Sequence, residues 1–209
     1  MKKCNQTKEW IVLKRCWILG ILFLFCMQSS AGAVATVTGD VIAKAQQYGI
    51  VYAKKSTQDF LKPWTTYEEE AMTLTEQSER AYIYTPYLLV ASDARERQNN
   101  NQAISLTESK ELLKDYAKTL TFQVILYGSD ASFAQDVSAT ITQGSTVKQA
   151  YQKIVPDKAD ALSDKQQYSV KCYFYFDEKD LDLNAPITLN VTKKDVFEKK
   201  FYFSLSQIQ

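Results

Sequence analysis

The stretch that decides the fold of this chain is residues 168–176, which read YSVKCYFYF. Its side chains alternate between an apolar set (Tyr168, Val170, Cys172, Phe174, Phe176) and a second set (Ser169, Lys171, Tyr173, Tyr175). A period of two residues places the two sets on opposite faces of an extended strand. The stretch therefore predicts a β-strand with one face packed on a core.

Four further stretches on either side show the same alternation of apolar and polar side chains. They are residues 121–127, 137–142, 187–192 and 201–206, and Lys193-Lys194-Asp195 joins the last two as a hairpin. Half-apolar strands with short connections are typical of an antiparallel sheet that packs on a core. We expect residues 119–209 to form an antiparallel β-sandwich of about five or six strands.

The chain before residue 119 has the spacing of helices instead. Expected helices are 38–55, with Gly49 as a weak point, 56–61, 86–98 after the cap Thr85, and 106–118 after the capping-box residue Ser105. Residues 65–78, rich in Thr and Glu, are interpreted as an exposed connection. The predicted fold class is α+β, with a helical region at 34–118 and the sandwich at 119–209. Because no linker separates them, one compact unit and two domains both fit.

The first 33 residues have the pattern of an export signal. Five basic residues accompany a 12-residue apolar run, Cys16–Met27, which small residues follow up to Ala33. As a helix, 12 residues span about 18 Å, well short of a hydrocarbon core of about 30 Å. We interpret residues 1–33 as a signal peptide cleaved after Ala33 or Ala35; the upstream apolar stretch 10–13 leaves an uncleaved anchor as an alternative.

Composition excludes several classes of function. The 209 residues contain no histidine, which rules out Ser-His-Asp and Cys-His catalysis and histidine-ligated metals. Removal of residues 1–33 takes away five basic residues and one acidic residue, which leaves 20 against 23 and a net charge of −3. A mildly acidic chain does not fit nucleic-acid binding, and no glycine-rich phosphate loop is present. We expect no cofactor, and contact with the membrane only through the signal segment during export.

The positions of the cysteines also fit an exported chain. Three of the four cysteines lie in residues 1–33, so that Cys172 would be alone in the exported chain, without an internal disulfide. Its place on the apolar face of the strand predicts a buried structural thiol.

Tyrosine supplies the first candidate binding site. Tyr173 and Tyr175 project from the polar side of their strand, and Tyr202 is placed similarly on another strand. If these strands are neighbours, the rings form a flat platform for sugar or peptide; cross-strand aromatic pairing that only stabilises the sheet is the alternative. The group Tyr82, Tyr84 and Tyr87 has the same two interpretations.

The loop at residues 177–184 is a candidate metal site. Asp180, Asp182 and Asn184 have the alternate spacing with which calcium loops direct oxygens at one cation. The match to an EF-hand then ends, because Ala185 replaces the turn glycine and Val191 the bidentate glutamate. A solvated acidic connection between strands is the alternative interpretation.

Together these features predict an exported, noncatalytic protein of a bacterial envelope, periplasmic or at the cell surface or beyond, that binds or supports an envelope protein or polysaccharide. Two alternatives remain from other classes. One is a calcium-stabilised adhesion module. The other is a hydrolase of envelope polysaccharide that uses two of the carboxylates at Glu68, Glu69, Glu70, Asp93, Glu96, Glu108 and Glu111.

Overall fold

The structure is a computed structural model that describes residues 37–162 and 167–204. All of these residues belong to one compact unit. The expected signal peptide, its two cleavage positions and the alternative anchor lie outside the described residues.

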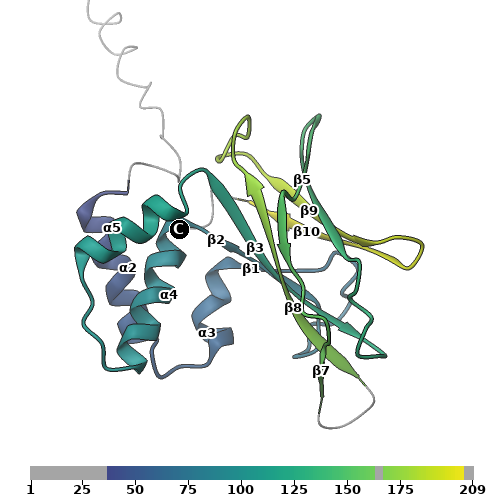
Figure 1. The fold of residues 1–209 in the computed structure, drawn as a ribbon, viewed down its shortest axis with the longest axis horizontal. Coiled ribbons are helices and arrows are strands. Elements are labelled where there is room, and N and C mark those ends of the chain that lie inside the picture. Colours follow the sequence, from purple (N-terminus) through teal and green to yellow (C-terminus); the bar gives the residue numbers. More distant parts are fainter. Residues whose placement is uncertain (1–36, 163–166, 205–209) are drawn as a thin grey trace, which may run out of the picture. The chain divides into compact units, whose positions relative to one another are not determined.

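Four α-helices and one 3₁₀ helix are found among the described residues, gathered beside the sheets (Figure 1). They are α2 (Gly39–Val51), α3 (Thr57–Leu61), η1 (Lys62–Trp64), α4 (Pro86–Asn99) and α5 (Leu106–Asp115). The expected caps are confirmed, since the hydroxyls of Thr38, Thr85 and Ser105 each accept a backbone N–H of the first helical turn. Within these ranges, no helix has the length and apolar character needed to cross a membrane.

Gly49 marks the close packing of α2 against α4, so its interpretation as a weak point was incomplete. A Cβ atom there would lie 2.2 Å from the backbone oxygen of Ala91 and 2.9 Å from the Cβ of Ala94. No side chain fits at such distances unless the two helices move apart. Gly49 lowers the helix propensity of α2 locally, but it permits the close contact between α2 and α4.

The strands form two antiparallel sheets. The six-stranded sheet has the order β1 (Thr65–Tyr67), β2 (Arg80–Tyr84), β3 (Thr119–Gly128), β8 (Tyr168–Asp177) and β6 (Gln152–Ile154), with β7 (Asp160–Ala161) also paired to β8. The four-stranded sheet has the order β10 (Phe197–Phe203), β9 (Ile187–Lys193), β4 (Ser138–Gln143) and β5 (Thr146–Gln149). The predicted α+β class with a sandwich-like pair of sheets is confirmed, as is the β9–β10 hairpin.

The N-terminal half contributes two strands that the sequence analysis did not expect. Residues 65–67 form β1 instead of part of an exposed connection, and the side chain of Glu68, which follows, is buried. Arg80–Tyr84 forms β2, which pairs with β3 along its whole length. Such a short segment becomes a strand because two long-range partners, β1 and β3, satisfy its backbone groups.

The core lies between the two sheets. Phe122 of β3, Phe174 and Phe176 of β8, and Phe201 and Phe203 of β10 are all almost completely buried, and the rings of Phe122 and Phe203 are 5.2 Å apart. Cys172 belongs to this inner face and is also fully buried, as predicted. Burial of these rings from two sheets supplies the hydrophobic stabilisation of the sandwich.

The two sheets are also joined at both sides. On one side the chain passes from β5 to β6 through Ala150 and Tyr151, whose backbone N–H groups donate to Ala139 in one sheet and Tyr175 in the other. On the other side the backbone N–H of Glu69 donates to the Lys200 carbonyl, 3.1 Å away. Both edges are therefore partly covered, which limits pairing with another chain.

Candidate functional site

The outer face of the six-stranded sheet collects tyrosines from both halves of the chain. In the strand register, Thr121 of β3 lies between Tyr84 of β2 and Tyr175 of β8. One pair of positions further along, Gln123 lies between Tyr82 and Tyr173. Because directly paired residues share a face, these four tyrosines surround Thr121 and Gln123 on the side of the sheet away from the sandwich core.

Two more tyrosines extend this face. Tyr116, at the end of α5, and Tyr151, just before β6, lie close enough to Tyr175 to contribute to the raised pKa of its hydroxyl, of which burial is the largest cause. The Tyr151 and Thr119 hydroxyls lie 3.2 Å apart. Tyr84, Tyr173 and Tyr175 are half-buried, whereas Tyr116 and Tyr151 are exposed. We call the set Tyr84, Tyr116, Tyr151, Tyr173 and Tyr175 the tyrosine surface; Tyr82 is buried beneath its neighbours and is not part of it.

Polar groups on this face are held in place by hydrogen bonds. The Tyr84 hydroxyl donates to Oε1 of Gln123 at 2.8 Å, and Nε of Arg80 donates to the Tyr82 hydroxyl at 2.8 Å. Gln123 itself is only 5% exposed. The Tyr82 and Tyr84 rings therefore have defined positions, which would lower the entropy lost if a ligand binds beside them.

Thr121 differs from these residues in its hydrogen bonding. Its side chain is 4% exposed, and its Oγ1 finds no hydrogen-bond partner among the described residues. Leaving a buried hydroxyl unpaired costs about 1–3 kcal/mol. A hydroxyl with no hydrogen-bond partner among the described residues therefore lies beneath the centre of the tyrosine surface, shielded from solvent.

The hydroxyls of Tyr84, Tyr173 and Tyr175 stay protonated well into the alkaline range. Burial raises the pKa of Tyr84 strongly, and the neighbouring Tyr173 raises it further. Burial likewise raises the pKa of Tyr173 and is the largest cause of the raised pKa of Tyr175. Each hydroxyl is therefore a neutral donor and acceptor at physiological pH.

One end of the tyrosine surface continues into a groove of about 520 Å³ between the helices and the sheet. We call it the junction groove. Tyr84 and Tyr116 are lining residues of the groove as well as members of the tyrosine surface. Its apolar lining includes Ile42, Leu89, Leu113, Leu120 and Leu183. A volume of this size lies within the range of ligand-binding cavities, about 300–1,000 Å³.

Charged residues around the junction groove are mainly basic. Lys110, Lys114 and Lys118 are exposed lining residues on or directly after α5, and Lys114 also pairs with Glu111 at 2.7 Å. Glu178 is the one carboxylate among the described lining residues. The groove therefore combines an apolar floor with a rim of net positive charge.

The structure brings together only part of the predicted platform. Tyr173 and Tyr175 lie on the same sheet as Tyr82 and Tyr84, on the other side of β3, but Tyr202 belongs to β10 of the other sheet, where its hydroxyl bonds to Glu69. A platform that includes Tyr202 requires β8 and β10 to be neighbouring strands, but these two strands belong to different sheets. Tyr87 is separate too: its ring stacks 6.0 Å from Trp64 within the helical region.

The acidic loop after β8 is organised by contacts within the protein. Nζ of Lys148 donates to the backbone carbonyls of Asp177 and Lys179, and so places an ammonium among the loop oxygens. Oδ1 of Asp182 accepts the backbone N–H of Asn184 at 2.9 Å, and Asp180 is exposed. Across the described ranges, no three Cys, Asp or Glu side chains are grouped as a metal site requires.

The carboxylates considered for hydrolysis are spread over the fold. Asp93 and Glu108 both pair with Arg97, at 2.9 and 3.1 Å, so these two carboxylates belong to a charge network on the helix surface. Glu69 lies 3.3 Å from Nζ of Lys200, far along the chain from the helical carboxylates. None of the seven is a lining residue of the junction groove. Cys172 also offers no nucleophile, because burial raises the pKa of its thiol to about 12.

Comparison with known proteins identifies no relative. No family model matches the sequence, and neither a curated protein nor a solved structure is similar to it at a significant level. The function must therefore be argued from the site.

Sequence reasoning missed Thr121, Tyr116, Tyr151 and the junction groove. The alternation of residues 121–127 did separate Thr121 and Gln123 from the core residues, so their shared face was visible in the sequence. The residues beside them could not be read from the sequence, because Tyr84 and Tyr175 are 91 positions apart and are brought to either side of Thr121 only by the strand register.

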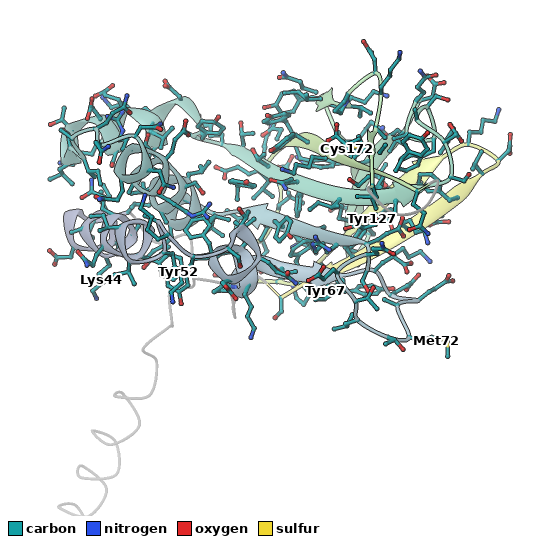
Figure 2. The ribbon with its side chains drawn as sticks, turned by 90° about the horizontal axis from the view of Figure 1, so that it is seen from below. Lys44, Tyr52, Tyr67, Met72, Tyr127 and Cys172 are labelled. Carbon is teal, nitrogen blue, oxygen red and sulfur yellow. The ribbon has the colours of Figure 1, made fainter. Side chains whose placement is uncertain are left out.

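Figure 2 shows Tyr67 and Tyr127 on the strands of the same sheet, whereas Met72 lies at the tip of the loop between β1 and β2.

Proposed function

We propose that this is an exported, noncatalytic binding protein of a bacterial envelope that binds polysaccharide through the tyrosine surface. The observation that carries this proposal is the gathering of tyrosines from β2, β8 and the segments beside them around Thr121 and Gln123. The export step rests on the basic and apolar pattern of residues 1–33.

The chemistry of the surface suits a sugar chain. Pyranose rings have apolar C–H faces and polar edges, and a tyrosine offers an apolar ring together with a hydroxyl. Gln123 and Thr121 are polar residues beneath the rings at the centre of the face, where their side chains are only 5% and 4% exposed. Since the hydroxyls of Tyr84, Tyr173 and Tyr175 are neutral, they suit a ligand that is rich in hydroxyl and amide groups.

Other classes of ligand and activity have less support. The net charge of −3 after export disfavours nucleic acid, although bases also stack on aromatic rings. Glycoside hydrolysis needs two carboxyl groups about 5–10 Å apart, and Glu178 is the sole carboxylate among the described lining residues of the groove. A calcium module lacks an observation in its favour, because Lys148 already contacts the loop carbonyls.

Binding to soluble oligosaccharides tests the function. Isothermal titration of the purified protein with chitohexaose, cellohexaose and maltohexaose should detect binding of at least one of them. The double variant Tyr173→Ser with Tyr175→Ser should weaken that binding about tenfold or more, because two ring contacts are lost. Tyr202→Ser is the matched control, since Tyr202 is an exposed tyrosine on the other sheet.

Two results would overturn this function. If the unmodified protein binds none of the three oligosaccharides, the polysaccharide proposal fails. If the double variant binds as well as the Tyr202→Ser control, the tyrosine surface is not the binding site. Circular dichroism of each variant confirms that the fold is intact before binding is compared.

N-terminal sequencing of the protein recovered from a bacterial culture tests export separately. A mature chain should begin at Val34 or Thr36, according to which of the two sites is cut. Recovery of the intact Met1 end from the cytosolic fraction would contradict export.

A further inference from the structure

The junction groove and the tyrosine surface form one continuous surface that has an aromatic part, a basic rim and an apolar groove. Tyr84 and Tyr116 belong to both, so a ligand that lies on the rings can reach the groove without leaving the protein. We propose that the ligand is an anionic glycolipid, with its sugar on the tyrosine surface, its phosphate at the lysine rim and its alkyl chain in the groove. This inference rests on the proposed function, because it takes the tyrosine surface as the sugar site.

The groove has the lining that an alkyl chain requires. Ile42 and Leu120 are buried at its floor, and Leu89, Leu113 and Leu183 are half-buried around them. Part of their apolar surface remains open in the free protein, and covering it removes that surface from water, a gain of about 0.8 kcal/mol for each methylene group that is fully buried. A polysaccharide alone has no apolar segment to place there.

The lysine rim supplies charge complementarity for the link between sugar and chain. Lys110 and Lys114 are one helical turn apart on α5, and Lys118 follows the helix end, so three lysines from one segment are lining residues of the groove, and Nζ of Lys114 also pairs with Glu111. Glu178, the opposing charge in the described lining, leaves this rim with a net positive charge. A phosphate diester between sugar and alkyl chain would meet these ammonium groups at the point where the groove joins the tyrosines.

The test compares two probes that differ only in the alkyl group. N-acetylglucosamine 1-phosphate is esterified on phosphate with either a methyl or a dodecyl group, and titrations use the protein as the cell delivers it, below the micelle concentration. The dodecyl probe should bind at least about tenfold more tightly than the methyl probe, because its chain is buried. Dodecyl phosphate without sugar should bind more weakly than the dodecyl glycoside.

Matched variants locate the alkyl chain. Ala117 is an exposed lining residue of the groove, so the larger side chain of Ala117→Trp occupies part of the groove and should abolish the dodecyl advantage. Ala103→Trp, at an exposed alanine outside the groove, should keep that advantage. Lys110→Gln with Lys114→Gln should weaken both probes several-fold, with a smaller dependence on salt than the unmodified protein shows.

Each result separates the inference from the function on which it rests. The glycolipid inference is overturned if the two probes bind with equal affinity, or if the dodecyl probe still binds more tightly to Ala117→Trp. In either case, binding of an oligosaccharide would still support the proposed function. Equal binding of dodecyl phosphate and the dodecyl glycoside identifies a plain anionic lipid and also overturns the inference. If neither probe nor any of the three oligosaccharides binds, both proposals fail.

Discussion

The two faces of the six-stranded sheet are built from the same strands and differ in almost every property. The inner face of β3 and β8 carries Phe122, Phe174 and Phe176, all fully buried against the second sheet. The outer face of the same strands carries Thr121, Tyr173 and Tyr175, and the buried Thr121 hydroxyl has no hydrogen-bond partner within residues 37–162 and 167–204. The inner face is explained by packing alone, whereas the outer face is not.

This difference separates residues that stabilise the fold from residues for which we propose a binding role. Large apolar side chains with no polar atoms maximise burial, which is the composition of the inner face. Half-buried tyrosines over an unsatisfied threonine are a poor solution for stability, because a buried polar group costs free energy. Such a departure from the best packing is expected where a surface serves binding.

The largest expected effect contrasts neighbouring residues on β8. Phe174→Ala should lower the free energy of unfolding by about 3–5 kcal/mol, because it removes a fully buried ring and leaves a cavity. Tyr173→Ala on the outer face should cost roughly 1 kcal/mol, since its ring is only half-buried. Urea denaturation followed by circular dichroism measures both; similar losses would mean that the outer face is a second core.

A smaller effect of opposite sign is expected at Thr121. Thr121→Val should raise the free energy of unfolding by about 1 kcal/mol, because a methyl group replaces an unpaired buried hydroxyl of the same shape. Thr142→Val on β4 is the matched control, since its Oγ1 accepts a hydrogen bond from Asn190 at 3.1 Å and the change should destabilise the protein. Differential scanning calorimetry compares the two, and a loss of stability in Thr121→Val would show that its hydroxyl is satisfied.

The smallest effect is a change of stability with pH that belongs to the outer face. Because the pKa values of Tyr84, Tyr173 and Tyr175 are raised in the folded protein, these hydroxyls ionise in the unfolded chain first, at about pH 10. The contribution of these protonated hydroxyls to the free energy of unfolding is fully present below about pH 10. It is lost as the pH rises toward the pKa values of the three tyrosines in the folded protein. Urea midpoints measured from pH 8 to 11 should fall less steeply for Tyr84→Phe than for the unmodified protein; parallel curves would contradict the assignment.

Much of the local structure could be predicted from the sequence because its causes are local. The alternation in YSVKCYFYF predicts β8 and its buried face, and the hydroxyls of Thr85 and Ser105 predict where α4 and α5 begin. These features depend on side chains within a few positions of each other, and periodicity and capping are properties of such short stretches. The absence of histidine was equally decisive, since it excludes whole classes of chemistry whatever the fold.

Only the tertiary structure decided which of these residues meet. The register of β2 with β3 and of β3 with β8 brings Tyr84 beside Thr121 and Tyr175, while Tyr202 goes to the other sheet. The approach of α2 to α4 gives Gly49 its role, and the meeting of helices and sheet creates the junction groove. Strand pairing and helix packing depend on contacts between distant segments, and a period of two or 3.6 residues reveals which face is buried but not the partner that covers it.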